Sequence, residues 1–292
     1  MVANFHVAEA PGSQQSVAGE TLCIGLNKPE LITLVFALLA SNAILSKIAT
    51  GIARDGWIYA AINTFEVSAI VWGGLAIGLR YAWRIEPTTI NSLDKFVAVA
   101  AFLACLLPLS PLTWPFMSVV AIYFIATSSG STSDQAHAGW IFLAVTVPMF
   151  WSKQLFSVFS NFFLAIDASL VAGITGTERT SNIVAMPGGA GYMQIAAPCS
   201  SMANVSLALL CWVLFTQVND MRWRPRNMLW CGLACLSVVS INVFRITLIG
   251  YFPQHFDLLH GPIGASVVSW LSLIVVVLIC NYGVRNGRNS TL

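Results

Sequence analysis

Apolar residues gather in long runs along this chain of 292 residues, and short polar segments separate the runs. A helix needs about 20 mostly apolar residues to cross the hydrocarbon core of a membrane. The pattern therefore predicts an all-α, polytopic membrane protein with about eight transmembrane helices, of which the third and fifth are short for a full crossing. The predicted spans are Leu31–Ala49, Ile58–Leu79, Phe96–Leu107, Leu112–Thr127, Ala138–Trp151, Ser201–Val218, Met228–Gly250 and Gly261–Tyr282.

Two segments between the fifth and sixth spans depart from this pattern. Leu155–Ile174 is apolar but carries several polar residues, and a crossing here would disturb the alternation of sides. We therefore expect an amphipathic helix along the outer interface of the membrane. Thr180–Ala197 has two short apolar stretches on either side of P-G-G-A-G. This pattern is typical of a β-hairpin with a glycine turn, which would lead the chain to Pro198 and Cys199.

Composition supports a membrane protein made of one domain. The chain is 57% hydrophobic and 9% charged, with a mean hydropathy of +0.76, whereas a soluble domain is roughly 25% charged. We expect one transmembrane domain over residues 31–284, a cytoplasmic segment before it (1–30) and a cytoplasmic tail after it (285–292). Membrane lipids are the expected surroundings, and no feature of the sequence indicates nucleic acid binding.

Cysteine spacing argues against a metal centre or a disulfide framework. Five of the seven cysteines lie inside predicted spans, where thiols usually pack as small hydrophobic side chains. The sequence also has no paired C-x-x-C motif, and we predict no cofactor and no metal ion. The five cysteines are Cys105, Cys211, Cys231, Cys235 and Cys280.

The distribution of positive charge predicts which side of the membrane each loop faces. The loop Asn219–Asn227 carries three arginines, and loops rich in Lys and Arg stay in the cytoplasm. With the N-terminus inside, nine of the fourteen Lys and Arg residues lie on the cytoplasmic side. Cys199 then lies at the outer end of the sixth span, and His260 lies in the outer loop before the last. Arg245 is 17 residues after Met228, roughly 26 Å along a helix, so it also approaches the outer face.

The side chains that meet at this face suit nucleophilic catalysis. A thiolate is a strong nucleophile, and an imidazole beside it can take the thiol proton and return it to a leaving amine. A guanidinium stays charged and offers a fixed fork of donors to a scissile carbonyl or its oxyanion. We therefore predict Cys199 as the nucleophile, with His260 and Arg245 as its partners.

Each of these residues also has a simpler interpretation. A cysteine in a membrane protein usually serves packing. An arginine inside an apolar run is a functional candidate by default, but near a helix end it can also be an anchor that reaches the interface. His255 lies five residues before His260 and competes with it for the role of the base.

Three further ionisable residues are candidates for the site. Glu66, eight residues after Ile58 in the second predicted span, either pairs with Arg245 or lines a substrate path, and structural pairing is favoured. Asp134 and His137 lie toward the opposite side of the membrane, so we expect no catalytic role for them.

Three short motifs mark the second half of the chain. They are P-C-S-S-M-A-N from Pro198, N-V-F-R-I from Asn242 and H-G-P-I-G from His260. With the interface helix and the hairpin before them, residues 138–282 resemble the exosortase/archaeosortase family of membrane-embedded processing enzymes. Two departures place the chain in a divergent branch: Ser201 replaces the usual glycine after Cys-Ser, and Gly261 and Pro262 replace an acidic residue that often follows the histidine.

The resemblance implies a cysteine protease or transpeptidase with Cys199 as nucleophile and Arg245 and His260 as partners. Its implied substrates are exported proteins with a C-terminal motif, a transmembrane helix and a basic tail. Cleavage through a thioester would occur at the periplasmic face of the inner membrane of a Gram-negative bacterium. Two other functions stay open: a transporter in which Arg245 binds an anionic solute, and an acyltransferase in the export of a polysaccharide.

Overall fold

The computed structural model describes residues 26–62, 64–106, 110–130, 133–189, 191–221 and 224–289. Most of the predicted cytoplasmic segment 1–30, Arg222 in the predicted cytoplasmic loop and the last three residues of the predicted tail lie outside these ranges. Helices make up most of the described chain, and one small sheet interrupts them.

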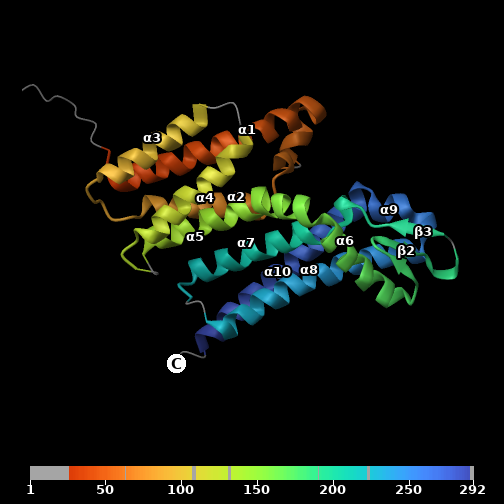
Figure 1. The fold of residues 1–292 in the computed structure, drawn as a ribbon. Helices are drawn as coiled ribbons and strands as arrows, with labels where there is room; N and C mark the ends of the chain where they lie inside the picture. The colour runs from red at the N-terminus through yellow and green to blue at the C-terminus, as the bar shows by residue number, and fades with distance from the viewer. Residues whose placement is uncertain are drawn as a thin grey trace, which may run out of the picture.

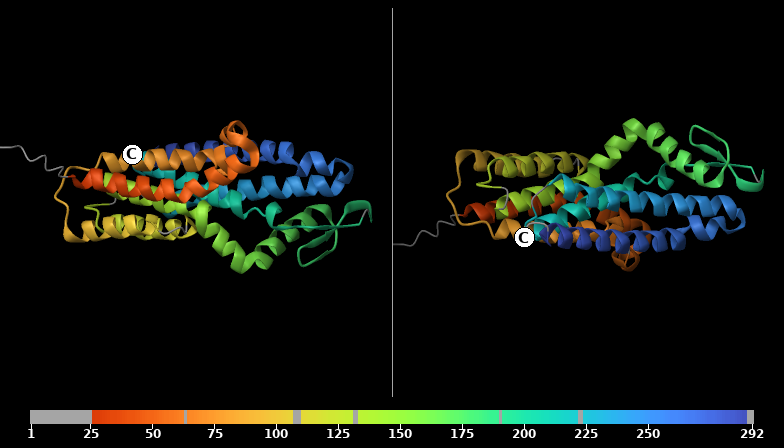
Figure 2. Two further views of the ribbon diagram at one scale, coloured as in Figure 1. Left: turned by 90° about the horizontal axis from the view of Figure 1, so that it is seen from above. Right: turned by 90° about the horizontal axis from the view of Figure 1, so that it is seen from below.

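The long helices lie side by side in an elongated bundle (Figure 1). The start of α1 and the C-terminus lie at one end of the bundle, here called the terminal end, and the strands and α9 lie at the other, the strand end (Figures 1 and 2). The helix bounds are α1 (Lys28–Ile62), α2 (Ala69–Trp83), α3 (Ser92–Leu106), α4 (Ser110–Ala126), α5 (Asp134–Thr146), α6 (Ser152–Thr175), α7 (Met202–Val218), α8 (Pro225–Tyr251), α9 (Phe256–His260) and α10 (Pro262–Asn289).

Five helical stretches among the described residues are long and apolar enough to cross a membrane. The fold is therefore all-α and of the membrane type, as predicted. In contrast, α2, α3, α4 and α5 have only 15, 15, 17 and 13 residues, so the count of eight crossings stays a prediction. The five stretches are Lys28–Ile62, Asp134–Thr175, Ala197–Val218, Pro225–Tyr251 and Ile263–Arg288.

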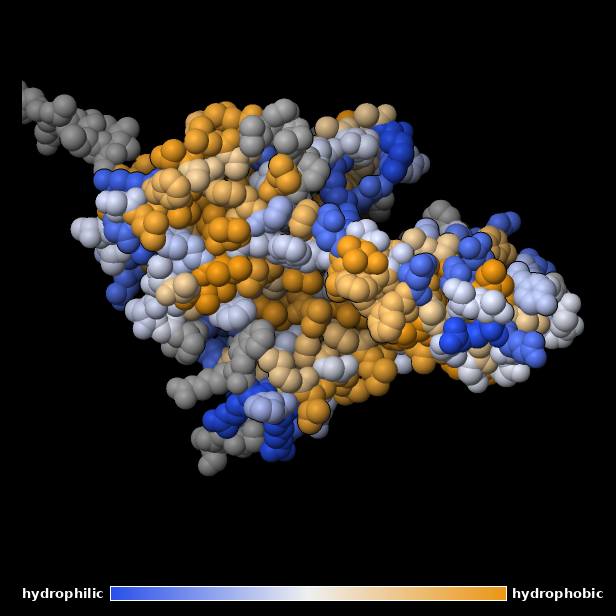
Figure 3. Space-filling view, viewed as in Figure 1, coloured by the Kyte–Doolittle hydropathy of each residue, from blue (hydrophilic) through white to orange (hydrophobic). Residues whose placement is uncertain are grey.

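The outside of the bundle is apolar along its length. Large hydrophobic side chains such as Leu45 and Leu278 are 60% and 61% exposed. Figure 3 shows hydrophobic residues over much of the side of the bundle and hydrophilic residues at its ends and over the last part of α1. This surface suits the membrane lipids expected around the chain.

The connection between the first two helices differs from the predicted spans. α1 continues to Ile62, with a break at Gly56, where φ is 77°. A 3₁₀ turn, η1 (Thr64–Glu66), follows with positive φ at all three residues. The second predicted span therefore begins too early, because residues 57–62 are apolar enough to hide the end of α1. Glu66 lies in this turn and not inside a span.

The predicted interface helix continues directly from the helix before it. A π-helical turn, η2 (Val147–Trp151), joins α5 to α6 without a loop, and α6 bends at Phe159. The bounds of α6 agree with the predicted segment Leu155–Ile174 to within three residues. Figure 2 shows α6 leaving the bundle and bending back toward the strands, and Val158 and Phe162 are exposed on it.

The predicted hairpin is confirmed, and a third strand extends it. β1 (Arg179–Thr180), β2 (Ile183–Ala185) and β3 (Tyr192–Gln194) form an antiparallel sheet in that order, with Val184 opposite Met193. The turn after β2 contains η3 (Pro187–Gly189), where φ is 75° at Gly188 and Gly189, a conformation that glycine adopts without steric cost.

The sheet is packed against two helices by its buried apolar residues. Val184 and Ile195 are 1% exposed and form one cluster with residues of α6 and α8. This packing fixes the chain between Ile195 and the start of α7, where Cys199 lies.

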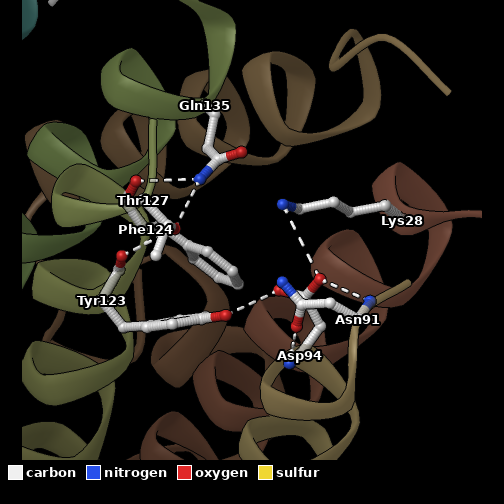
Figure 4. A network of polar contacts seen from close by, with 7 residues as sticks. All are labelled: Lys28, Asn91, Asp94, Tyr123, Phe124, Thr127 and Gln135. Atoms are coloured by element: carbon white, nitrogen blue, oxygen red, sulfur yellow. Dashed lines mark hydrogen bonds and ion pairs between the residues drawn. The ribbon is translucent and has the colours of Figure 1, made fainter. Parts of the chain in front are cut away.

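A polar network fixes the terminal end of the bundle (Figure 4). Asp94 of α3 is buried, accepts a hydrogen bond of 2.8 Å from the Tyr123 hydroxyl of α4 and lies 3.7 Å from Lys28 at the start of α1. Nearby, the Gln135 amide of α5 donates to the Phe124 carbonyl at 2.9 Å. These contacts join four helices at the end opposite the strands, and the largest apolar core fills the space between α1, α2, α4 and α5.

Candidate active site at the strand end

Cys199 lies at the junction between the sheet and α7. It ends a 3₁₀ turn, η4 (Ala197–Cys199), and its backbone N–H donates to the Ala196 carbonyl at 2.9 Å. The side chain is half-buried. Its Sγ lies 3.7 Å from His260 Nε2, although the two residues are 61 apart in sequence. A thiol and an imidazole are therefore within hydrogen-bonding distance for sulfur.

A tight turn presents His260 to the thiol. His260 ends α9, and its ring stacks on Phe256 with centroids 4.8 Å apart. A Cβ on Gly261 would collide with the Asp257 carbonyl oxygen, and one on Gly264 would collide with the carbonyl oxygens of Leu258 and Leu259. The glycines of H-G-P-I-G therefore permit α10 to begin directly after α9.

Arg245 holds the backbone of the segment that carries His260. Its Nε donates to the Leu259 carbonyl at 3.0 Å, and its Nη2 donates to the His260 carbonyl at 3.2 Å. Among the described residues, Nη1 makes no hydrogen bond. The guanidinium thus donates to two successive backbone carbonyls. This differs from the prediction that the whole fork of donors faces a substrate carbonyl.

Asn242 holds the backbone of Cys199, as Arg245 holds the backbone of His260. The Asn242 amide is buried and donates to the Cys199 carbonyl at 2.7 Å and to Ser201 Oγ at 3.0 Å. Residues three apart on a helix lie on the same face. The N-x-x-R spacing on α8 therefore places one donor group on each half of the candidate site.

Asp167 is a site residue that the sequence analysis missed. It lies on α6 and is 3% exposed. Its carboxylate accepts two hydrogen bonds from Ser201, one from the backbone N–H at 3.0 Å and one from Oγ at 2.8 Å. The available signal was a carboxylate within an apolar helix, but Asp167 is one of several polar residues in the predicted interface helix, and the sequence does not set it apart from them.

The remaining candidates lie elsewhere. His255 is exposed in the 3₁₀ turn η5 (Pro253–His255), and no contact with Cys199 is found for it. Glu66 Oε1 lies 2.7 Å from Arg54 Nη2. Glu66 therefore forms an ion pair, as favoured, but its partner is Arg54 and not Arg245.

His137 makes structural contacts at the terminal end of the bundle. It is buried on α5, its Nδ1 lies 2.7 Å from Gln217 Oε1 of α7, and its Nε2 lies 2.9 Å from Asp220 Oδ1. Asp134 is the first residue of α5. Both lie far along the bundle from Cys199, as expected. The five cysteines predicted inside spans lie on α3, α7, α8 and α10.

Comparisons with protein-family models, with curated proteins and with solved structures found no match for this chain. The resemblance to exosortases therefore remains a prediction that rests on the three sequence motifs.

Replacing Asp167 by alanine should destabilise the protein and loosen the start of α7. The change leaves two buried donors of Ser201 without an acceptor, at a cost of about 1–3 kcal/mol for each unsatisfied group. Thermal unfolding of the purified protein measures the loss. Asp257→Ala, at an exposed position on α9, is the matched control and should leave the unfolding temperature nearly unchanged. Equal unfolding temperatures for the two variants would contradict the assigned role of Asp167.

Proposed function

We propose that this chain is an exosortase-like cysteine peptidase or transpeptidase of the membrane. The observation that carries the proposal is the distance of 3.7 Å between Cys199 Sγ and His260 Nε2. A nucleophile within reach of a base, with the base held by a third group, is the arrangement that covalent catalysis requires. Arg245 is that third group here, and it acts through the backbone of His260.

The proposed reaction passes through a thioester. His260 takes the thiol proton while sulfur bonds to the carbonyl carbon of the substrate. The carbon–nitrogen bond then breaks, and the imidazolium returns the proton to the leaving amine. Water would complete a proteolysis, whereas an amine or hydroxyl of a second molecule would complete a transfer. These steps use no cofactor and no metal ion.

The oxyanion of the tetrahedral intermediate needs donors that are not already engaged. The N–H groups of Cys199 and Ser200 donate to the carbonyls of Ala196 and Ala197, so they are occupied. We assign this role to Nη1 of Arg245, since the other nitrogens of the guanidinium fix its position.

The proposed location and substrates rest on the sequence. From the positive loops we infer that the strand end faces the periplasm at the inner membrane. The proposed substrates are exported proteins with a C-terminal motif, a transmembrane helix and a basic tail, because the recognition motif of such a protein would lie just outside the bilayer, where Cys199 would be.

Neither of the two alternatives is favoured by the site. A transporter that binds an anion through Arg245 would need a free guanidinium fork, but two of its nitrogens bond to backbone carbonyls. An acyltransferase would use the same thiol and imidazole, and no separate observation favours it.

Cys199→Ala should abolish processing of exported substrates while the protein remains folded in the membrane. In a strain that lacks the wild-type gene, mass spectrometry of exported proteins would show C-terminal signals that stay uncleaved. Cys211→Ala and Cys280→Ala remove buried thiols inside helices and should retain processing. A Cys199→Ala strain that processes its exported proteins normally would end the enzyme proposal.

Arg245→Lys should be nearly inactive, because lysine keeps the charge but cannot donate to two carbonyls from one plane. We expect a loss on the order of 100-fold in processing rate at matched enzyme level, by analogy with the loss of one preorganised donor. His260→Ala should be inactive and His255→Ala active in the same assay. Normal processing by Arg245→Lys would demote Arg245 to an anchor, and a loss only with His255→Ala would move the base.

A labelling experiment tests the side of the membrane. A variant with Cys199 as its sole cysteine should react with a membrane-impermeant maleimide added outside inner-membrane vesicles of native orientation. A variant with Arg226→Cys as its sole cysteine should react only after permeabilisation, since Arg226 is exposed at the terminal end. The reverse pattern would place the site on the cytoplasmic side.

A further inference from the structure

A cavity of about 450 Å³ lies between α10, α7 and the connection from α1 to α2. We call it the α10 cavity. Its polar lining consists of Thr64, Glu66, Ser68, Asn204, Ser266, Ser269 and Ser272, and its apolar lining comes mainly from α2, α7 and α10.

The two chain segments that form the site also lead into this cavity. Asn204 follows Cys199 by five residues, and Ala265 follows His260 by five, and both line the cavity. On α10 the lining extends from Ala265 to Val276, roughly 16 Å along the helix axis. The cavity therefore begins one or two helical turns from the thiol and the imidazole and extends away from the strand end.

The wall on α10 offers hydroxyl groups. Ser266, Ser269 and Ser272 recur every third residue, which keeps them near one side of the helix. Ser272 is 5% exposed, and its Oγ has no hydrogen-bond partner among the described residues. A buried hydroxyl without a partner is uncommon, and little water is available at membrane depth to supply one. This hydroxyl therefore indicates a ligand with hydrogen-bonding groups.

The charge of the lining limits the kinds of ligand that the cavity can bind. Glu66 is the one ionisable side chain among the residues described around the cavity, and Arg54 pairs with it at 2.7 Å. A charged ligand would find no free counter-charge here. The acyl chain of a lipid would give Ser272 no partner, and an intact helix already uses its own backbone groups. An extended, uncharged polypeptide has the free N–H and C=O groups that fit.

We propose that the α10 cavity binds the part of the substrate polypeptide that lies next to the scissile bond on the membrane side, in an extended conformation. The inference rests on the proposed function. Ser272 and the hydroxyls above it bond to the substrate backbone, and the apolar wall receives its side chains.

Two reagents with different needs test the cavity on the full chain in lipid nanodiscs. Iodoacetamide alkylates Cys199 without needing the cavity. The second reagent is a biotinylated peptide of uncharged residues, made as a mixture of sequences, with an epoxide in place of a central amide bond. The Cys199 sulfur opens the epoxide by bonding to one of its carbons, and the released oxygen takes the proton from His260. Rates of labelling at Cys199 are followed by mass spectrometry.

Three variants separate the outcomes. Ser272→Leu narrows the cavity and removes the hydroxyl, whereas Ser272→Ala only removes the hydroxyl. Ser240→Leu on α8 is the control, because Ser240 is exposed outside the cavity and its Oγ donates to the Leu236 carbonyl. We expect labelling by the epoxide to slow about tenfold or more with Ser272→Leu and about threefold to tenfold with Ser272→Ala. Labelling by iodoacetamide should stay close to wild type in both, and Ser240→Leu should affect neither reagent.

Several results would overturn the proposal. Unchanged epoxide labelling in both Ser272 variants would show that the peptide does not bind in the α10 cavity. The proposed function would not be affected by this result. The same holds if a co-purified phospholipid is lost from Ser272→Leu while epoxide labelling is unchanged. Equal losses with both reagents would show that the variants act on Cys199 itself and would also overturn it. An epoxide that fails to label Cys199 in the wild type would contradict the proposed function together with the cavity.

Discussion

The hydrogen bonds between Asp167 and Ser201 join the segments on which the whole strand end depends. A carboxylate that is 3% exposed is costly in an apolar bundle unless donors satisfy it. Ser201 supplies two of them, from its backbone and its hydroxyl. The start of α7 is thereby tied to α6, whose apolar face also supports the sheet. Without these bonds, η4 and Cys199 would be held only by the packing of a short hairpin and by the hydrogen bonds of Asn242.

Polar groups inside the bundle must find partners within the protein. The same constraint explains why two polar side chains of α8 bond to backbone carbonyls at the site. Asn242 bonds to the Cys199 carbonyl, and Arg245 bonds to the His260 carbonyl. Two side chains one turn apart on a single helix therefore fix both backbones that meet at the site. A helix is rigid over so short a distance, so the separation of the thiol and the imidazole is set by α8 more than by the mobile ends of the side chains.

Sequence reasoning predicted the helical membrane fold, the hairpin and the three residues that meet at the strand end. Hydrophobic runs and glycine turns are local signals, and they placed α7 and α8 to within three residues, whereas α10 continues seven residues past the predicted end at Tyr282. Glu66 was misplaced because the apolar stretch after Gly56 conceals the end of α1, and its partner Arg54 could not be read from a pattern. Asp167 was missed because its partner Ser201 is 34 residues away, a relation that only the fold creates.

Ser201 is one of the two departures from the motifs of the family that the sequence resembles, and in the structure this serine has a clear structural role. Its Oγ donates to Asp167 and accepts from Asn242, so it connects the two polar residues that hold the start of α7. A glycine there would keep the backbone N–H but would leave one carboxylate oxygen and one amide hydrogen unpaired in a buried place. Buried groups left in that state cost more than the original bond contributes. Serine at position 201 and aspartate at position 167 are therefore expected to depend on each other.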